Sequence, residues 1–303
     1  MTVTAPSDGA ARISTGRATA LILISACGFG SIAIFTVLAT RTGAGLLTLL
    51  LGRYAGAAII LAIIGIDRVR RVPRERALRI LIIAGAGQAL LAYASLYSLR
   101  YITAATLVFL FYTYPAWVAL IGAARGVERI DGPRAAALGL ALAGVVAMVG
   151  APGSAALHPL GAGIALGCGL LYALYIPLIN HLQRGLDPIA TTTFISAGVA
   201  IILLVAGAAA GSLSFALHPV AWAAIGGLIL FSTVVAFIAF LRGLAVLGPV
   251  RTAIVSTIEP FWTTVLAALL LSQPLTPSAA IGGTLIASAV VLLQWGSART
   301  AAA

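Results

Sequence analysis

Ten long apolar runs follow one another along the chain, separated by short gaps that hold charges, prolines or clusters of glycine. A helix that crosses a bilayer needs about 20 apolar residues. Backbone polar groups in lipid must be satisfied within the segment, which favours helices over open strands. The pattern predicts an all-α integral membrane protein with ten transmembrane helices, at residues 18–40, 45–66, 77–98, 102–123, 134–151, 159–181, 188–210, 220–242, 248–271 and 276–296.

The two ends of the chain differ from the runs. Residues 1–16 are rich in Ala, Ser and Thr and are expected to form a disordered N-terminal tail. The first run follows Arg12 and Arg17 as in a signal peptide, but it is too long and has no convincing small-residue cleavage site. We therefore expect it to stay in place as a membrane anchor. Residues 298–303 are expected to form a short C-terminal tail.

One short motif occurs twice. Tyr-Pro-Ala-Trp at residues 114–117 lies deep in the fourth run, and Glu-Pro-Phe-Trp at 259–262 lies 145 positions later in the ninth run. The chain therefore divides into two units of five runs, 17–151 and 152–297. Because five is odd, the second unit enters the bilayer from the opposite side. Inverted repeats of this kind build transporter sites that can open to either face.

Composition agrees with a membrane protein. Hydrophobic residues make up 61% of the chain and charged residues 8%, whereas about 25% is usual in soluble domains. The net charge of +11 alone would suggest nucleic acid, but the arginines lie in gaps between runs and not along one face. The lipid bilayer is the expected partner, and nucleic acid is not. Cys27 and Cys168 lie within runs and are interpreted as small core residues.

Arginine placement predicts the orientation, since short cytoplasmic loops carry an excess of Arg and Lys. With a cytoplasmic N-terminus, 15 of the 18 basic residues lie inside, and Arg41, Arg53 and Arg100 lie outside. An even number of spans places both termini in the cytoplasm. The inner arginines are Arg12, Arg17, Arg68, Arg70, Arg71, Arg74, Arg76, Arg79, Arg125, Arg129, Arg134, Arg184, Arg242, Arg251 and Arg299.

The fifth run of each unit carries a pair of small residues four positions apart, Gly139 with Ala143 and Gly283 with Ala287. Such pairs let helix backbones approach closely in lipid. We expect these two runs to pack against other helices, or to form the face of a homodimer. They are not expected to be walls of a substrate site.

These features resemble the EamA-type members of the drug/metabolite transporter superfamily. The resemblance covers residues 18–296 and rests on two inverted five-helix units, a Pro within each fourth span, Glu259-Pro260, and Gly-x-Glu at 126–128. It implies a carrier of the cell inner membrane that exports amino acids or other small metabolites, most similar to YddG-type exporters of aromatic and neutral amino acids. Gln273 stands where the family often keeps a Glu, so a role for that second carboxylate is absent.

Glu259 is the one acid placed near the centre of a run. An intramembrane carboxylate is costly and is by default a functional hypothesis. Burial disfavours its charged form, so Glu259 is a candidate for carrying a proton and coupling proton movement to export. The alternative is a protonated Glu259 that only hydrogen-bonds a neighbouring helix or a freed carbonyl. The two interpretations carry equal weight.

Pro115, Pro177 and Pro260 lie inside runs. Proline lacks an N–H donor, and its ring clashes with the preceding turn, so each helix is expected to kink or open there. Irregular backbone at membrane depth is tolerated only where protein or an aqueous cavity satisfies it. Taken singly, each kink is as well explained by packing. The matching positions of Pro115 and Pro260 favour a gate.

Deep aromatic and polar residues are expected to line a central cavity, because buried hydroxyls need partners and rings bind apolar side chains. For any one tyrosine, a contact between helices is an equally good explanation. Basic residues are not found near a span centre, which disfavours phosphorylated substrates and favours zwitterions or uncharged metabolites. The predicted cavity residues are Gln88, Tyr93, Tyr97, Tyr114, Trp117, Tyr172, Tyr175, Glu259 and Trp262.

The sequence therefore predicts a secondary transporter that moves a small-molecule substrate by alternating access. A variant is efflux of lipophilic cations held by Glu259 and aromatic faces. An alternative of another class is a membrane scaffold or receptor without transport. The histidines, at positions 158, 181 and 218, lie at span ends and in loops, and the runs hold no catalytic constellation. Enzyme activity, a cofactor and a metal are accordingly not expected.

Overall fold

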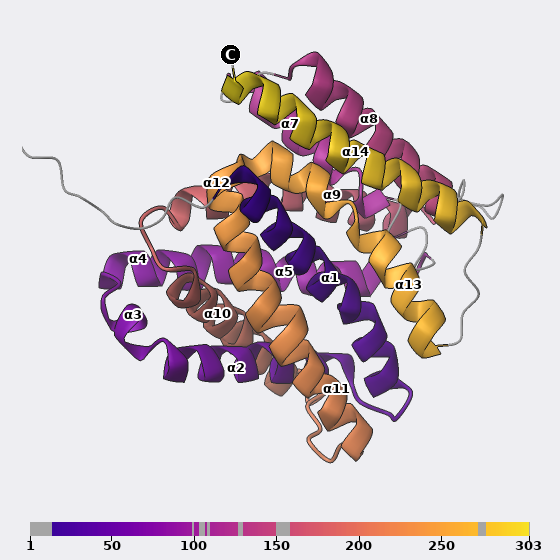
Figure 1. Ribbon diagram of the computed structural model, residues 1–303. Coiled ribbons are helices and arrows are strands. Elements are labelled where there is room, and N and C mark those ends of the chain that lie inside the picture. The colour runs from indigo at the N-terminus through magenta and orange to yellow at the C-terminus, as the bar shows by residue number, and fades with distance from the viewer. Residues whose placement is uncertain are drawn as a thin grey trace, which may run out of the picture.

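The computed structural model describes residues 14–98, 100–102, 107, 110–126, 130–149, 158–271 and 277–302. Helices joined by short turns make up this part of the chain, and it contains no strand (Figure 1). Residues 1–13 of the predicted N-terminal tail lie outside the described residues. Helix α1 begins at Thr15, where the Ser14 side chain accepts a hydrogen bond from the Arg17 N–H as a helix cap.

Helices lie within all ten predicted runs. The first half contains α1 (Thr15–Thr40), α2 (Leu46–Ile64), α3 (Ile66–Arg70), α4 (Arg74–Arg79), the π-helical η1 (Ile80–Ala84), α5 (Gly85–Ser98), α7 (Tyr114–Ala124) and α8 (Gly132–Val149). The second half contains α9 (Pro159–Leu182), α10 (Pro188–Ala209), α11 (Pro219–Ile229), the π-helical η2 (Leu230–Val235), α12 (Ala236–Ser256), α13 (Glu259–Leu271) and α14 (Pro277–Ala302).

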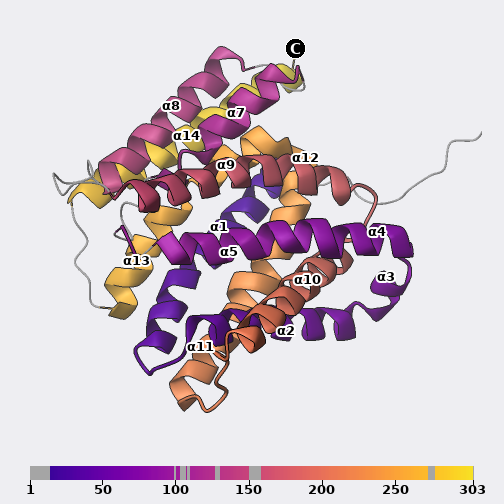
Figure 2. The ribbon, with the colours of Figure 1, turned by 180° about the vertical axis from the view of Figure 1, so that it is seen from behind.

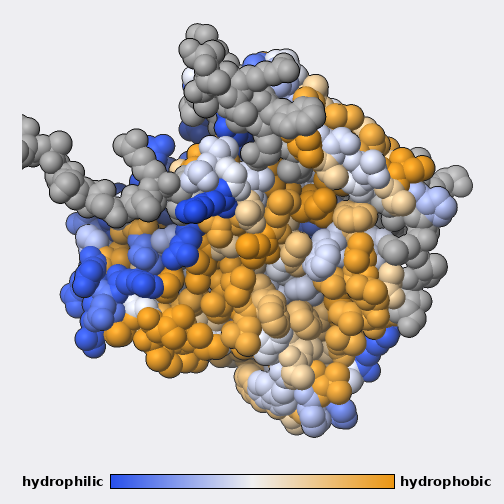
Figure 3. All heavy atoms as spheres, viewed as in Figure 1, coloured by the Kyte–Doolittle hydropathy of each residue, from blue (hydrophilic) through white to orange (hydrophobic). Residues whose placement is uncertain are grey.

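Six helical segments of the described chain are long and apolar enough to cross a membrane, and four shorter apolar helices accompany them. Large apolar side chains such as Ile63, Val205 and Leu269 are exposed on the outside of the fold. Hydrophobic residues cover much of the face seen in Figure 3. A soluble protein does not present so large an apolar surface to water. The chain is therefore a multi-pass membrane protein.

The helix pairs repeat between the two halves. Helix α1 packs against α12, and α9, the first helix of the second half, packs against α5 (Figures 1 and 2). Helix α2 packs against its counterpart α10, and α8 packs against its counterpart α14. These contacts from the first half to the second are thus returned by the corresponding helices. This is the packing expected of two like units that cover each other's apolar faces.

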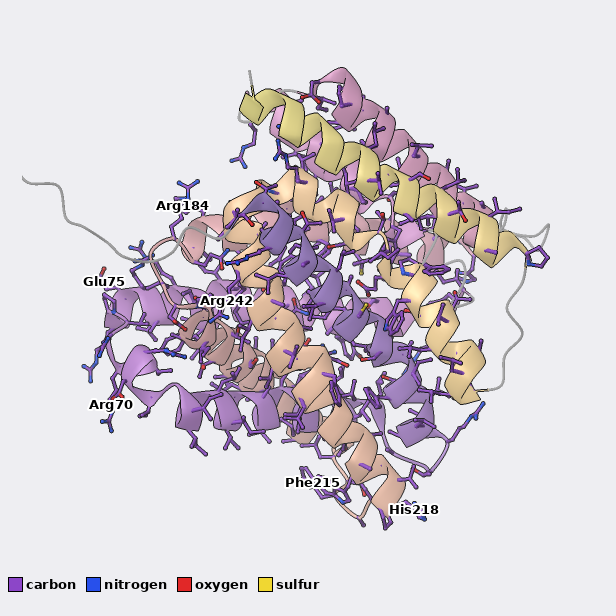
Figure 4. The ribbon with its side chains drawn as sticks, viewed as in Figure 1. Arg70, Glu75, Arg184, Phe215, His218 and Arg242 are labelled. Atoms are coloured by element: carbon purple, nitrogen blue, oxygen red, sulfur yellow. The ribbon has the colours of Figure 1, made fainter. Side chains whose placement is uncertain are left out.

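One end of the molecule gathers charge over α3 and α4, where Figure 3 shows a hydrophilic patch. Arg68 Nε lies 3.6 Å from the Asp187 carboxylate, and Arg76 Nη2 donates to the carbonyls of Leu182 and Arg184. The segments after α2 and after α9 therefore lie side by side, and Figure 4 shows Arg70 and Arg184 at this same end. The arginine count assigns both segments to one membrane face.

Element α12 contains a kink at Gly248, whose φ of 74° and ψ of 172° are not helical. This backbone region is essentially restricted to glycine. Pro249 follows and begins a new helical stretch within the same element. The predicted boundary between the runs 220–242 and 248–271 therefore corresponds to this kink, although α12 spans both sides of it.

Helices α8 and α14 lie side by side at one edge of the molecule (Figures 1 and 2). Gly144 makes the close contact, since a Cβ there would lie 2.7 Å from the Gly282 carbonyl oxygen. A Cβ at Gly139 would meet no atom within 4 Å. The expected packing of these two helices is present, but it uses Gly144 and not the predicted Gly139. Helix α14 continues to Ala302 and includes most of the predicted tail at 298–303.

Candidate functional site

A cavity of about 280 Å³ lies between the two halves of the chain. Its described lining comes from α1, α2, α5, α9, α12, the beginnings of α7 and α13, and the residues just before α7; none comes from α8 or α14. This volume is near the lower end of the range for small-molecule sites. Its polar and aromatic lining residues are Phe29, Thr36, Arg53, Tyr54, Gln88, Ser95, Phe111, Tyr112, Tyr114, Tyr172, Tyr175, Phe237, Phe240 and Glu259.

Two helix breaks meet at this cavity. The backbone leaves the helix at residues 112–113, before α7, and again at 257–258, before α13. Pro115 and Pro260 are each the second residue of the helix that follows the break. A proline is well accommodated in a first helical turn, where its missing N–H costs no hydrogen bond. The repeated prolines thus mark the points at which the fourth span of each half starts a new helix.

The two breaks are bonded to each other. The Tyr114 hydroxyl, at the first break, donates to the Ala253 carbonyl at 3.4 Å. In a regular helix that carbonyl would accept from the N–H of Thr257. Here the Thr257 N–H bonds instead to the Ile254 carbonyl at 3.2 Å. Tyr114, which is only 2% exposed, therefore satisfies a carbonyl that the break in the other half releases.

Glu259 lies at the second break and faces the cavity. Tyr112, from the first break, lines the same cavity beside it. Thr263 Oγ1 lies 3.0 Å from both the Glu259 carbonyl and the Gly30 carbonyl, so it ties the first turn of α13 to α1. Groups from both halves thus position this carboxylate.

Arg53 corrects the sequence interpretation, which places it on the outer side and expects no basic residue near a span centre. It lies within α2, is 4% exposed and lines the cavity. Its Nε donates to Thr233 Oγ1 at 2.7 Å, and its Nη2 donates to the Ser232 carbonyl at 2.9 Å. The guanidinium carbon also lies 4.8 Å from the centre of the Tyr54 ring. An arginine inside an apolar run is by default a candidate functional residue, so Arg53 could have been found from the sequence by this criterion.

Both partners of Arg53 belong to η2, a π-helical turn in the third span of the second half. A π-helical turn interrupts the regular hydrogen-bond ladder and is frequent at functional sites. The first half carries a similar turn, η1, in its own third span. There the Tyr175 hydroxyl donates to the Ala84 carbonyl at 3.2 Å. Each unit therefore sends polar side chains to the irregular turn of the other, Arg53 and Ser31 to η2 and Tyr175 to η1.

Five predicted cavity residues line the cavity together: Gln88, Tyr114, Tyr172, Tyr175 and Glu259. Gln88 Nε2 donates to the Tyr54 hydroxyl at 3.1 Å. The Tyr172 ring stacks on Phe111 with centroids 5.4 Å apart and meets Tyr114 edge-on at 4.8 Å. The result is a continuous aromatic wall beside the charged groups. Such rings bind apolar side chains, and their hydroxyls bind polar ends.

Four predicted residues do not line the cavity: Tyr93, Tyr97, Trp117 and Trp262. Tyr93 is 46% exposed, because it lies five residues after Gln88 and the helix turns by about 140° over that distance. Trp117 lies about a turn beyond Tyr114 and is 38% exposed. Trp262 packs against α1 beside Gly30. Pro177 lies inside α9, which stays continuous through it, so no helix end forms there.

Sequence reasoning misses several lining residues, among them Tyr54 and three phenylalanines. Phe29 of α1 meets Phe237 of α12 edge-on with ring centroids 5.2 Å apart, and it lies 6.0 Å from Phe240. No motif surrounds these phenylalanines in the sequence. They reach the cavity because α1 packs against α12, which is a contact between the two halves. Glu128 and Gln273, the acid and amide that follow the fourth spans, lie outside the described residues.

The EamA-like transporter family matches the chain twice, at residues 16–150 and 159–295. No curated protein matches the chain. Among solved structures, one described as "Crystal structure of protein" is 20% identical, with a TM-score of 0.77 over 95% of this chain and 99% of that chain. At that identity the likeness shows the fold alone. The two family matches together cover nearly the whole chain, which therefore belongs to the EamA-like transporter family of the drug/metabolite transporter superfamily.

Proposed function

We propose that this protein is a secondary transporter that exports small neutral or zwitterionic metabolites, aromatic and neutral amino acids foremost, by alternating access. The observation that carries the proposal is the aromatic cavity between the two family repeats, where the helix breaks before α7 and α13 are bonded to each other. Carriers commonly place substrate sites at the interface of two repeats, next to discontinuous helices.

The topology proposed with it has ten spans, in two inverted five-helix units at 17–151 and 152–297, in an inner (cytoplasmic) membrane with both termini in the cytoplasm. The two family matches support the division into units. The arginine-rich end that joins the segments after α2 and α9 supports a common cytoplasmic face. The four shorter apolar helices, in α7, α8, α13 and α14, bring the six long segments to ten, and α7 and α13 each follow a break within their span.

The helix breaks supply the gate of the proposed mechanism. A continuous helix resists bending, whereas a span interrupted before Pro115 or Pro260 allows its two parts to move separately. The Tyr114 hydroxyl and the Ala253 carbonyl hold the two breaks together in the present conformation. Opening to one side would exchange this bond for another partner or for water. Glu259, beside the same contact, is the proposed site of proton coupling.

The cargo follows from the chemistry of the lining. Phe111, Tyr114 and Tyr172 form a wall for an apolar or aromatic side chain. Arg53 and Glu259 place one positive and one negative group in the same cavity. A molecule of zero net charge matches this pair, whereas a phosphate or dicarboxylate meets one cation and one repelling anion. A zwitterion is thus still the best match. The reason is now the presence of both Arg53 and Glu259, and not the lack of a basic residue that the sequence suggested.

Efflux of lipophilic cations is the second candidate function. Glu259 and the surrounding rings favour a cation. Arg53 opposes it, because a guanidinium in a buried cavity repels a second positive charge. A scaffold or receptor without transport has less support, since it would not need two bonded helix breaks around a cavity.

Transport by purified protein in liposomes tests the proposal. Liposomes preloaded with an unlabelled amino acid should accumulate labelled phenylalanine, tyrosine or leucine by counterflow, and protein-free liposomes should not. Uptake of a cationic dye without uptake of any amino acid would favour the second candidate. Tyr93→Ala is a suitable control variant, because Tyr93 lies off the cavity and its loss should leave the amino-acid preference unchanged.

A further inference from the structure

We infer that the cavity binds an α-amino acid at two separate poles, with the Arg53 guanidinium on the substrate carboxylate and the Glu259 carboxylate on the substrate ammonium group. The inference rests on the proposed function and names the residues that recognise the substrate class. It assigns opposite roles to two residues that the chain separates widely and the cavity brings together.

Hydrogen bonds from one edge of its guanidinium hold Arg53 in place. Its hydrogen bonds within the described residues use Nε, to Thr233 Oγ1, and Nη2, to the Ser232 carbonyl. A guanidinium has five N–H donors in a rigid fork, so the donors on Nη1 remain for a group inside the cavity. The Tyr54 ring, 4.8 Å from the guanidinium carbon, restricts its movement. A preoriented guanidinium of this kind suits a carboxylate, which it can bind through two oxygens.

Glu259 supplies the opposite pole. It lines the same cavity from the first turn of α13, and the Tyr112 hydroxyl beside it provides a second oxygen. An ammonium group has three donors and no acceptor, so a site with a carboxylate and a phenol oxygen matches it. The rings of Phe111 and Tyr172 continue the wall from this point and would receive the substrate side chain.

The two charges are close enough to interact, but they do not form an ion pair. Neither Arg53 nor Glu259 takes part in an ion pair with another described residue. Opposite charges that are buried apart from each other lose solvation without gaining a direct contact. A zwitterion placed between them would pair both at once. A simple cation or anion would pair only one.

A bracing role is the competing explanation for Arg53. Its bonds to Ser232 and Thr233 join α2 to η2, and a residue that only stabilises this junction would show the same two contacts. The two roles differ in what they do to ligands. If Arg53 only stabilises the junction, its loss should lower the affinity for every ligand alike. If it binds a carboxylate, its loss should lower the affinity only for ligands that carry a carboxylate. Ligand truncation combined with substitution therefore separates them.

The test uses the purified full-length protein in lipid nanodiscs and three probes of one shape. L-phenylalanine carries both charges, phenethylamine lacks the carboxylate, and 3-phenylpropionate lacks the ammonium group. The wild-type protein should bind phenylalanine at least about tenfold more tightly than either truncated probe, as expected for a charged hydrogen bond. In Arg53→Gln, the affinity for phenylalanine should fall at least about tenfold, while the affinity for phenethylamine should change by less than about twofold.

Glu259→Gln should give the reciprocal result: the affinity for phenylalanine should fall, and the affinity for 3-phenylpropionate should stay unchanged. Arg53→Lys should keep part of the carboxylate preference, because it keeps the charge but not the fork. Arg70→Gln removes an exposed arginine outside the cavity and should bind all three probes as the wild type does. If Arg53→Gln does not fold, the wild-type truncation series and Glu259→Gln still test the two poles.

The experiments distinguish failure of the two-pole inference from failure of the proposed transport function. If Arg53→Gln weakens all three probes equally, or if phenethylamine and phenylalanine bind wild type equally well, the two-pole inference is wrong and the transport proposal stands. If none of the probes binds and liposomes accumulate no amino acid, the proposed function itself is wrong. A wild-type preference for phenethylamine over phenylalanine would overturn the inference in favour of the cation carrier.

Discussion

Arg53 donates from Nη2 to the main-chain carbonyl of Ser232 at 2.9 Å, across the boundary between the two repeats. Ser232 lies in η2, the π-helical turn of the second unit. Tyr175 of the second unit makes the converse bond, to the Ala84 carbonyl of η1 in the first. The two units therefore anchor each other through equivalent irregular turns around one cavity. A movement that opens the cavity must keep or exchange these two bonds together.

Tyr114→Phe tests the bond between the helix breaks. The substitution keeps the ring and removes the hydroxyl that donates to the Ala253 carbonyl. Leaving that buried carbonyl without its partner should cost about 1–3 kcal/mol in the present conformation and shift the protein toward other states. We expect lower thermal stability and an altered exchange rate in liposomes. Tyr93→Phe, at an exposed ring, is the matched control, and equal behaviour of the two variants would contradict the gate role.

Glu259→Gln tests proton coupling. Glutamine imitates the protonated side chain but cannot release a proton, so uptake driven by an imposed pH gradient should be lost. Counterflow exchange, which needs no net proton movement, should persist to a larger degree. Flux is measured across a series of pH values, with and without the imposed gradient. A pH profile identical to that of the wild type would leave Glu259 with a structural role only.

Gly144→Ala tests the contact between α8 and α14. A methyl group there would lie 2.7 Å from the Gly282 carbonyl oxygen, so the helices must separate. We expect a loss of about 1–3 kcal/mol in the free energy of unfolding. Gly139→Ala is the matched control on the same helix, since it has open space around it. That control should be neutral or stabilising by about 0.5–1 kcal/mol. Thermal unfolding in detergent compares the pair.

Gly248→Ala tests the kink within α12. A side chain at φ 74° and ψ 172° is strained, so the variant should lose about 1–3 kcal/mol of stability. Gly226→Ala in α11 is a control, because a methyl group there meets no atom within 4 Å. Equal melting temperatures for the two variants would show that the backbone conformation at Gly248 does not require glycine. A lower melting temperature for Gly248→Ala alone would confirm that it does.

The helices and their membrane character could be predicted because they depend on local properties. Lipid requires each span to satisfy its own backbone, so about 20 apolar residues suffice to locate one. The backbone breaks beside Pro115 and Pro260 also follow from the chemistry of a single residue type. Pro177 differs from them, because it lies inside α9 and the helix continues past it.

The composition of the cavity could not be predicted in the same way. Charge counting assigns Arg53 to the outer side, although it is buried in α2. Depth along the chain places Tyr93 in the cavity, although the helix turns it outward. Depth in a span follows from position in the sequence. Whether a side chain faces the cavity or the outside depends on which helices pack around its own, and position in the sequence does not specify that packing.

The sequence by itself determined that the chain is duplicated, that its spans are helical, and where the two fourth spans break. Only the tertiary structure decided that Arg53 meets Ser232, 179 positions away, and that Tyr114 meets Ala253, 139 positions away. The reason is that apolar periodicity and proline act within a few residues. A binding cavity arises from side chains of distant helices, and their meeting depends on how whole helices pack.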